Sequence, residues 1–257
     1  MSSKKDSLGD RMKEMYESAY STKLPGRLPI VLRADGRSFH QYTKGLKRPW
    51  DDSLNLVMDM TAKALCADIS GAQIAYVQSD EISILIHPYK KLGSQTYFDG
   101  KVQKIVSVSA GVASSTFTAE SWRLNDEKQI KPACFDSRVF ILPEAEVTNY
   151  FKWRQDDATR NSVQMLARSL YSHKECNNKN NSELQELCFQ KGHNWNDVPT
   201  RHKRGRCIVK EQYPVEITNR EGLTETVMRS RWTVDEEIPV FSQDREYINK
   251  YLATEEE

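Results

Sequence analysis

The chain has 257 residues, 38% of them hydrophobic, which is enough to bury a sizeable core in one large domain or in a domain with an extension. Its 37 lysine and arginine residues nearly balance 36 aspartate and glutamate residues, so a nucleic acid would have to bind a local basic patch rather than a generally positive molecule. The five cysteines lack CxxC spacing, the N-terminus lacks the apolar stretch of a signal peptide, and no run of about 18 apolar residues occurs. We therefore expect a reduced, cytoplasmic protein without a membrane span.

The first half of the chain alternates between strand-like and helical patterns. In chain order the patterns predict a strand at 28–32, a helix capped by Asp-Asp-Ser at 51–53 that ends before Gly71, strands at 72–77 and 82–86 joined by a hairpin turn, a helix from Asp99 or Gly100, and a strand at 135–142. This order of strand, helix, strand, strand, helix, strand predicts an α+β fold with a ferredoxin-like βαββαβ sheet.

The pattern changes after Pro143. In chain order we predict a long helix at about 144–171, a polar interruption at 177–182, a shorter helix near 183–190, a basic turn at 201–206, strand-like segments at 207–209 and 215–217, and a final helix ending at 255–257. Residues 1–142 are therefore predicted to form the catalytic domain, and residues 143–257 an extension of helices and strands.

Carboxylates stand where two of the predicted strands emerge into solvent. Asp35 follows the first strand, and Asp80 and Glu81 form the hairpin tip. In the expected topology these strand ends are neighbours, so the carboxylates can meet and hold two Mg²⁺ ions about 3.5–4 Å apart, as nucleotidyl transfer requires. Gly36 favours this interpretation because its backbone can approach a metal or a phosphate closely. The structural alternative is that Asp35 caps a turn and the acidic pair is only a polar hairpin tip.

Four motifs of this sequence resemble those of tRNA-histidine guanylyltransferase and its like-proteins. They are Asp-Gly-Arg-x-Phe-His at 35–40, Gln-Ser-Asp-Glu at 78–81, Phe-Asp-Ser-Arg-Val at 135–139 and Trp-Arg-Gln at 153–155. The motifs keep the family's order, and the resemblance extends over about residues 28–210.

The resemblance implies a polymerase-type palm that adds nucleotides to the 5′ end of tRNA in the 3′-to-5′ direction. The RNA 5′ phosphate is activated by ATP or already carries a triphosphate, and the 3′-hydroxyl of GTP or another nucleoside triphosphate then attacks it. The resemblance implies that Asp35 and Asp80 ligate two Mg²⁺ ions, that Gly36 adds its carbonyl, and that Glu81 supports the metal site as a third catalytic residue. The nucleotide-binding residues that it implies are Asp35, Gly36, Arg37, Ser38, Phe39, His40, Ser79 and Asp80.

Two departures from the family's pattern refine these expectations. The family usually has Lys-Pro after its first motif, whereas this chain has Lys47-Arg48-Pro49, so the forked guanidinium of Arg48 is expected to share or take over the triphosphate contact of a lysine. The eukaryotic enzymes carry His-Ile-Asn-Asn where this chain has residues 159–162, Thr-Arg-Asn-Ser. This difference favours the like-protein branch, whose members repair 5′-truncated tRNA under the direction of the template strand.

Basic residues of the second half are candidates for contact with tRNA. They are Arg154, Arg160, Asn161, Arg201, Lys203, Arg204 and Arg206, the last four in the basic turn and Asn161 as a polar neighbour. The alternatives are a solvated loop for the turn and an intrahelical ion-pair ladder for Arg154, Asp157 and Arg160. Trp153 is expected in the core or at a subunit interface. The family suggests a homotetramer, in which one tRNA could touch several subunits.

Other functions remain open on the sequence. Guanylate addition to tRNA-histidine is the nearest alternative, and the missing His-Ile-Asn-Asn disfavours it. Nucleotide cyclisation on the same palm would leave the Trp-Arg-Gln helix without an obvious purpose. A different class of function is a non-catalytic module that binds tRNA or nucleotides, and the intact carboxylates disfavour it.

Overall fold

The structure, a computed structural model, describes residues 7–91, 93–124, 131–218 and 224–254. The described strands form one six-stranded antiparallel sheet with the order β4-β1-β3-β2-β5-β6. The strands are β1 (Ile30–Gly36), β2 (Ala72–Gln78), β3 (Glu81–Ile86), β4 (Phe135–Ile141), β5 (Arg206–Thr218) and β6 (Thr224–Asp235). The α-helices are α1 (Ser7–Met12), α2 (Phe39–Tyr42), α3 (Asp52–Asp68), α4 (Val102–Leu124), α5 (Glu144–Leu170), α6 (His173–Cys176), α7 (Asn181–Gln190), α8 (Thr200–Arg204) and α9 (Glu246–Asn249).

The first half contains the predicted elements in the predicted order, β1, α3, β2, β3, α4 and β4. Asp51 caps α3 as expected, because its Oδ1 accepts a hydrogen bond from the backbone nitrogen of Leu54 at 2.9 Å. The hairpin turn falls between β2 and β3 at Ser79 and Asp80. The mixed α+β fold inferred from the sequence is therefore confirmed.

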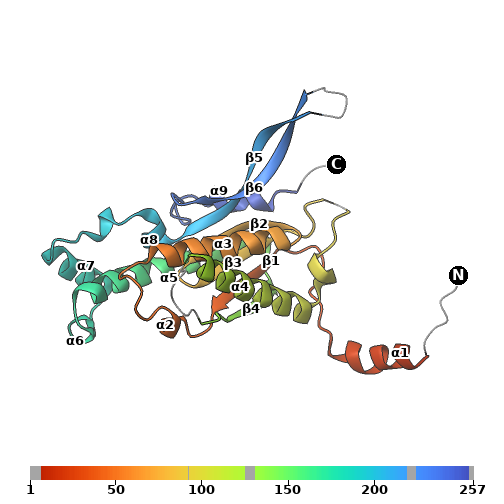
Figure 1. Cartoon of the computed structure of the whole chain (residues 1–257), viewed down its shortest axis with the longest axis horizontal. Helices are drawn as coiled ribbons and strands as arrows, with labels where there is room; N and C mark the ends of the chain where they lie inside the picture. The colour runs from red at the N-terminus through yellow and green to blue at the C-terminus, as the bar shows by residue number, and fades with distance from the viewer. Residues whose placement is uncertain (1–6, 92, 125–130, 219–223, 255–257) are drawn as a thin grey trace.

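Both faces of the central sheet are covered by helices, which explains why its strands are apolar on both sides (Figure 1). Alternate residues of β1, such as Leu32 and Ala34, pack on α3 and α4, which lie side by side on one face. Val31 points to the other face and packs with Phe151 of α5 and Phe241 near the C-terminus. The same alternation places Asp35 on the face that α5 partly covers.

The second half continues the sheet, because β5 pairs with β2 and then with β6. Both strand-like segments predicted at 207–209 and 215–217 lie in strands, as expected, but they belong to one strand, Arg206–Thr218, which pairs with β6, a strand that the sequence analysis missed. The predicted basic turn is partly wrong, because Thr200–Arg204 is a helical turn and Arg206 begins β5. Of the predicted last helix, the structure shows the short α9, and residues 255–257 lie outside the described residues.

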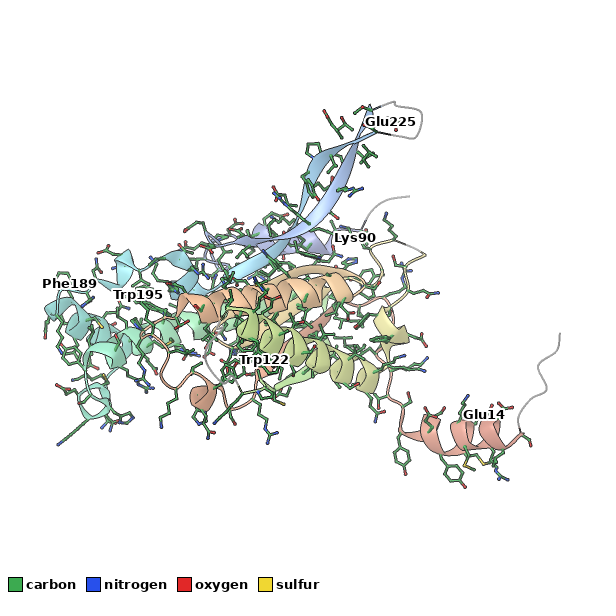
Figure 2. The ribbon with its side chains drawn as sticks, in the orientation of Figure 1. Glu14, Lys90, Trp122, Phe189, Trp195 and Glu225 are labelled. Carbon is green, nitrogen blue, oxygen red and sulfur yellow. The ribbon has the colours of Figure 1, made fainter. Side chains whose placement is uncertain are left out.

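Two segments project from the body of the molecule. Helix α1, with the π-helical turn Lys13–Glu17 that follows it, and the far end of the β5–β6 hairpin stand away from the rest of the molecule, where Figure 2 labels Glu14 and Glu225. Within the described residues, no helix has the length and apolar character needed to cross a membrane.

Candidate active site

Three carboxylates lie in one row across three neighbouring strands, near the ends of those strands. Asp35 of β1 stands opposite Glu81 of β3 on one side and opposite Asp136 of β4 on the other. Side chains directly opposite each other in an antiparallel pair share one face, so these three point the same way. The backbone nitrogen of Gly36 donates to the carbonyl of Asp80 at 3.0 Å, which ties the hairpin turn to the end of β1. The two acidic segments selected from the sequence therefore meet.

Burial and mutual repulsion disfavour negative charge on both aspartates. Burial, then the neighbouring Asp136, raises the pKa of Asp35, although the guanidinium groups of Arg33 and Arg138 oppose the rise. Burial also raises the pKa of Asp80, where Asp35 and Glu81 add to the rise and hydrogen bonds oppose it. A divalent cation between these carboxylates would remove both penalties, because it compensates their charge.

Glu81 is held by an arginine rather than left free. Nε and Nη2 of Arg154 donate to its two carboxylate oxygens at 2.7 and 2.6 Å, and both side chains are buried. Ser83 donates to the same carboxylate at 3.2 Å. This bidentate contact fixes Glu81 beside Asp35 and identifies Arg154 as a residue that positions the site.

The loop after Gly36 presents polar groups around a buried aromatic anchor. A Cβ at Gly36 would lie 2.3 Å from the ring of Phe39, so only glycine fits there. Phe39 itself is 4% exposed and packs against Tyr42 and Phe135. The side chain of Phe39 is thus a core group, and a nucleotide contact at this position would have to use the backbone. Arg37, Ser38 and His40 are exposed beside it.

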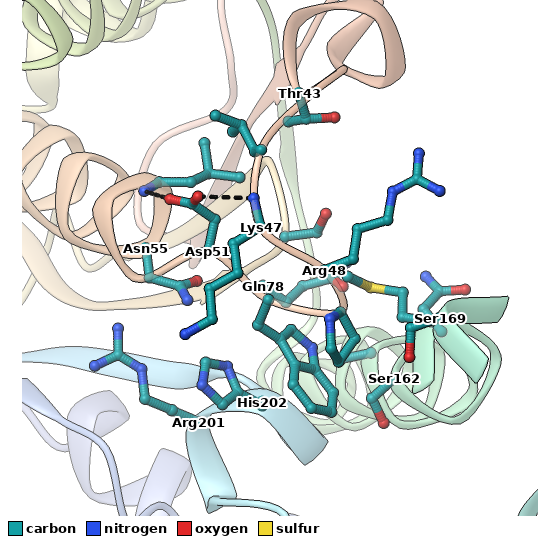
Figure 3. A pocket seen from close by; sticks show the side chains of 18 of the residues that line it. Thr43, Lys47, Arg48, Asp51, Asn55, Gln78, Ser162, Ser169, Arg201 and His202 are labelled. Carbon is teal, nitrogen blue, oxygen red and sulfur yellow. Dashed lines mark hydrogen bonds between the residues drawn. The ribbon is translucent and has the colours of Figure 1, made fainter. Parts of the chain in front are cut away.

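A pocket of about 470 Å³ opens next to this loop and the hairpin turn (Figure 3). Four of the residues that the sequence analysis assigned to the nucleotide line it, namely His40, Lys47, Arg48 and Ser79. Asp51 shapes the rim, since its two carboxylate oxygens accept hydrogen bonds from the backbone nitrogens of Leu54 and Lys47 (Figure 3). The volume lies in the range of about 300–1,000 Å³ that is typical of pockets for small molecules.

The opposite wall of the pocket comes from α5 and α8 of the second half. His202 of α8 stacks on Trp50, with ring centroids 4.8 Å apart and planes inclined by 13°. Burial, with help from Arg201, lowers the pKa of His202 to about 4, so its ring is neutral at pH 7. The sequence analysis missed Trp50, Asn55 and His202 as lining residues.

The basic residues proposed for tRNA contact separate into two groups. Arg206 is 1% exposed, donates through Nε to Asp59, and donates through Nη2 to the carbonyl of Asn55 at 2.9 Å. Because its guanidinium and that of Arg154 are buried and paired, neither can reach an RNA phosphate in this structure. Those two expectations are therefore not supported.

The other candidates remain accessible in part. Asn161 and Arg201 line the pocket, whereas Lys203 and Arg204 are half-buried and Arg160 is exposed. The ion-pair ladder is present, because Arg154 and Arg160 donate to Asp157 at 3.0 and 2.7 Å.

Trp153 does not belong to the core. Its side chain is 50% exposed, and the guanidinium of Arg154 lies over its ring at 4.5 Å.

Comparison with known proteins decides the family. A model of the tRNAHis guanylyltransferase family matches residues 9–143, which is more than half of the chain. The chain belongs to this family. It is 30% identical over 216 residues to a probable tRNA(His) guanylyltransferase of Dictyostelium discoideum, a match that spans 78% of this chain and 82% of the relative.

Solved structures of this family agree with that assignment. A bacterial tRNA(His) guanylyltransferase-like protein in complex with ATP is 44% identical, with a TM-score of 0.85 over 97% of this chain and 100% of that one. A bacterial protein of the same description in complex with GTP is also 44% identical, with a TM-score of 0.80 over 96% and 99% of the two chains. The tRNA(His) guanylyltransferase of Saccharomyces cerevisiae is 25% identical, with a TM-score of 0.66 over 76% and 91%. The chain is therefore a nucleotidyltransferase of the guanylyltransferase-like branch.

Proposed function

We propose that this enzyme adds nucleotides in the 3′-to-5′ direction to the 5′ end of 5′-truncated tRNA, guided by the opposing strand of the acceptor stem. The observation that carries the proposal is the meeting of Asp35 and Asp80 beside a pocket of small-molecule size, which is lined by Ser79, the residue before Asp80, and by His40 of the loop after Gly36. The first half, residues 1–142, would then act as a polymerase-type palm. Residues 143–257 would complete the pocket, bind tRNA and support a homotetramer.

The two aspartates fit Mg²⁺. Mg²⁺ takes one or two protein carboxylates and fills its other positions with water and substrate phosphates. The raised pKa values of Asp35 and Asp80 supply the electrostatic reason for cation binding. Asp35, Asp80 and the carbonyl of Gly36 would hold two such ions, which stabilise the attacking and leaving oxygens of phosphoryl transfer when bound.

The chain's own side chains would bind and orient the nucleotide. Lys47 and Arg48 are exposed cations on the pocket rim, where they can neutralise a triphosphate. Ser79 and His40 offer polar groups between that rim and the carboxylates. Glu81, fixed by Arg154, keeps the end of β3 rigid beside Asp35.

We assign ATP and a second nucleoside triphosphate, such as GTP, as substrates. The similar bacterial proteins were solved with ATP and with GTP, so relatives of this fold accept both purines. ATP would activate a 5′-monophosphate, and the incoming nucleotide would extend the activated end. Arg160, Lys203 and Arg204 remain our candidates for contact with the RNA.

A truncated tRNA tests the function directly. The tRNA lacks its first 5′ nucleotide and is supplied as a monophosphate with ATP, or as a triphosphate without it, together with Mg²⁺ and each nucleoside triphosphate in turn. Extension by the nucleotide that matches the template is expected. Addition of G opposite every base would establish guanylylation instead, and retention of tRNA without extension would establish a binding module.

Substitution of the metal ligands gives a second test. Asp35→Ala and Asp80→Ala should each abolish incorporation and leave retention of tRNA on a filter largely intact. Asp156→Ala is the matched control, because this exposed aspartate of α5 pairs only with Lys152 among the described residues. Loss of tRNA retention in a folded Asp35→Ala or Asp80→Ala protein would contradict the metal role.

A further inference from the structure

A second cavity, of about 160 Å³, is lined by residues from the end of α5, from α6 and from the segment that leads to α7. Figure 1 shows these three helices at one end of the molecule. The cavity is separate from the carboxylates and has had no role so far. Its polar lining consists of Gln164, Arg168, His173, Asn177, Asn178 and Lys179. The volume is below the range of about 300–1,000 Å³ that whole small-molecule ligands occupy, so only a single small group fits.

The lining is rich in donors and contains no acidic residue among those described. Arg168, His173 and Lys179 have no hydrogen bond or ion pair to any described residue. The nearby carboxylates are occupied in helix caps. Glu175 accepts from the backbone nitrogen and hydroxyl of Ser172 at 2.8 and 2.6 Å, and Glu183 accepts from the backbone nitrogen of Asn180 at 2.7 Å. Arg168 and Lys179 therefore line one cavity without an ion-pair partner among the described residues, which favours an anion there.

We infer that this cavity binds one phosphate group of the RNA backbone. Arg168 can grip a phosphate with its forked guanidinium, Lys179 supplies a second charge, and the neighbouring amides supply neutral donors. The inference rests on the proposed function for its source of phosphate, since a polymerase of tRNA presents a phosphodiester chain here. Free inorganic phosphate has the same chemistry, and the experiment separates the two sources.

The position of Arg168 links the cavity to the reaction. This residue lines both the small cavity and the nucleotide pocket. Arg168 lies seven positions after Asn161 on α5, which corresponds to about 10 Å along a helix. The cavity therefore holds the RNA a short distance beyond the nucleotide and fixes its register relative to the carboxylates.

Lys179→Ala is the decisive variant, because Lys179 lines the small cavity and does not line the nucleotide pocket. Lys174→Ala is the matched control, since Lys174 is an exposed lysine of α6 outside the lining. Affinity for the truncated tRNA is measured without nucleotides by filter binding from 50 to 200 mM salt. ATP affinity and competition by inorganic phosphate are measured on the same proteins.

One lost phosphate contact should lower the slope of log affinity against log salt by about 0.7–0.9, so tRNA affinity should change about threefold less between 50 and 200 mM salt. We expect this in Lys179→Ala, with ATP affinity unchanged and with Lys174→Ala like the wild type. An unchanged slope in Lys179→Ala, or an equal loss in Lys174→Ala, overturns the inference. Phosphate binding that Lys179→Ala abolishes while its tRNA slope stays normal would assign the site to free phosphate and overturn the RNA source. The experiment measures binding and not nucleotide addition. Its result can therefore be interpreted even if the proposed catalytic function fails its own test.

Discussion

Removing the guanidinium of Arg154 should destabilise the protein strongly, because it leaves the carboxylate of Glu81 buried and unpaired. Arg154→Ala deletes the hydrogen bonds of 2.7 and 2.6 Å to Glu81, whose exposure is only 5%. Breaking one side of a buried ion pair costs about 3–5 kcal/mol. The contact with the part-exposed Asp157 adds no more than about 1 kcal/mol.

Arg160→Ala provides the matched control on the same helix. Arg160 pairs with the same Asp157 at 2.7 Å, but its own side chain is 58% exposed. A surface pair of this kind contributes about 0–1 kcal/mol. The two variants therefore remove the same functional group from α5. Arg154→Ala leaves the buried carboxylate of Glu81 without its partner, whereas Arg160→Ala affects only the part-exposed carboxylate of Asp157.

Urea unfolding followed by circular dichroism measures both free energies of unfolding. We expect Arg154→Ala to lose about 3–5 kcal/mol and Arg160→Ala less than about 1 kcal/mol relative to the wild type. If Arg154 acted mainly on RNA, its alanine variant would keep its stability and lose tRNA affinity. Free energies of the two variants that agree within about 1 kcal/mol would refute the structural role of Arg154.

Three further predictions concern protonation and backbone conformation. Because the pKa of Asp80 is raised, its negative charge lowers the free energy of unfolding above about pH 4. Asp80→Asn should therefore stabilise the metal-free protein at pH 7 and progressively less toward pH 4, as measured by urea unfolding at several pH values. A gain in stability that is larger at pH 4 would contradict this. The lowered pKa of His202 means that stability is lost as the pH falls from about 6.5 toward 4, by about 2–3 kcal/mol. His202→Phe keeps a flat ring and should remove most of that loss, whereas an unchanged pH profile would show that other groups cause it. Gly205→Ala should cost more than Gly192→Ala in thermal unfolding, since both have φ near +80° but only the former would bring a Cβ to 2.7 Å from atoms of β2; equal costs would show that the fold relaxes around the clash.

Local patterns were sufficient for the first half of the fold. The apolar strands, a helix cap within 51–53 and a hairpin turn near Asp80 depend on neighbours in sequence, and the structure has them where they were predicted, except that Glu81, expected at the hairpin tip, is the first residue of β3. Strand β6 was missed because most of it lies in the exposed part of a two-stranded hairpin, where no apolar alternation is needed, and only its end, with Trp232 and Val234, packs on the core.

Long-range pairings could not be read from the sequence. Asp136 faces Asp35 only because β4 pairs with β1 in one register. The buried guanidinium groups of Arg154 and Arg206 pair with Glu81 and Asp59, which lie 73 and 147 positions away in the sequence. A basic residue in a polar segment looks the same before folding whether it faces solvent or a buried acid, so these two were assigned to RNA contact.

The nucleotide pocket takes its two walls from opposite halves of the chain. The loop and hairpin that carry Asp35 and Asp80 form one wall, and α8 with His202 forms the other. Under the proposed function, a substitution in the helical turn α8, more than a hundred residues downstream of the acidic motifs, can therefore change how the nucleotide is bound while the carboxylates stay as they are.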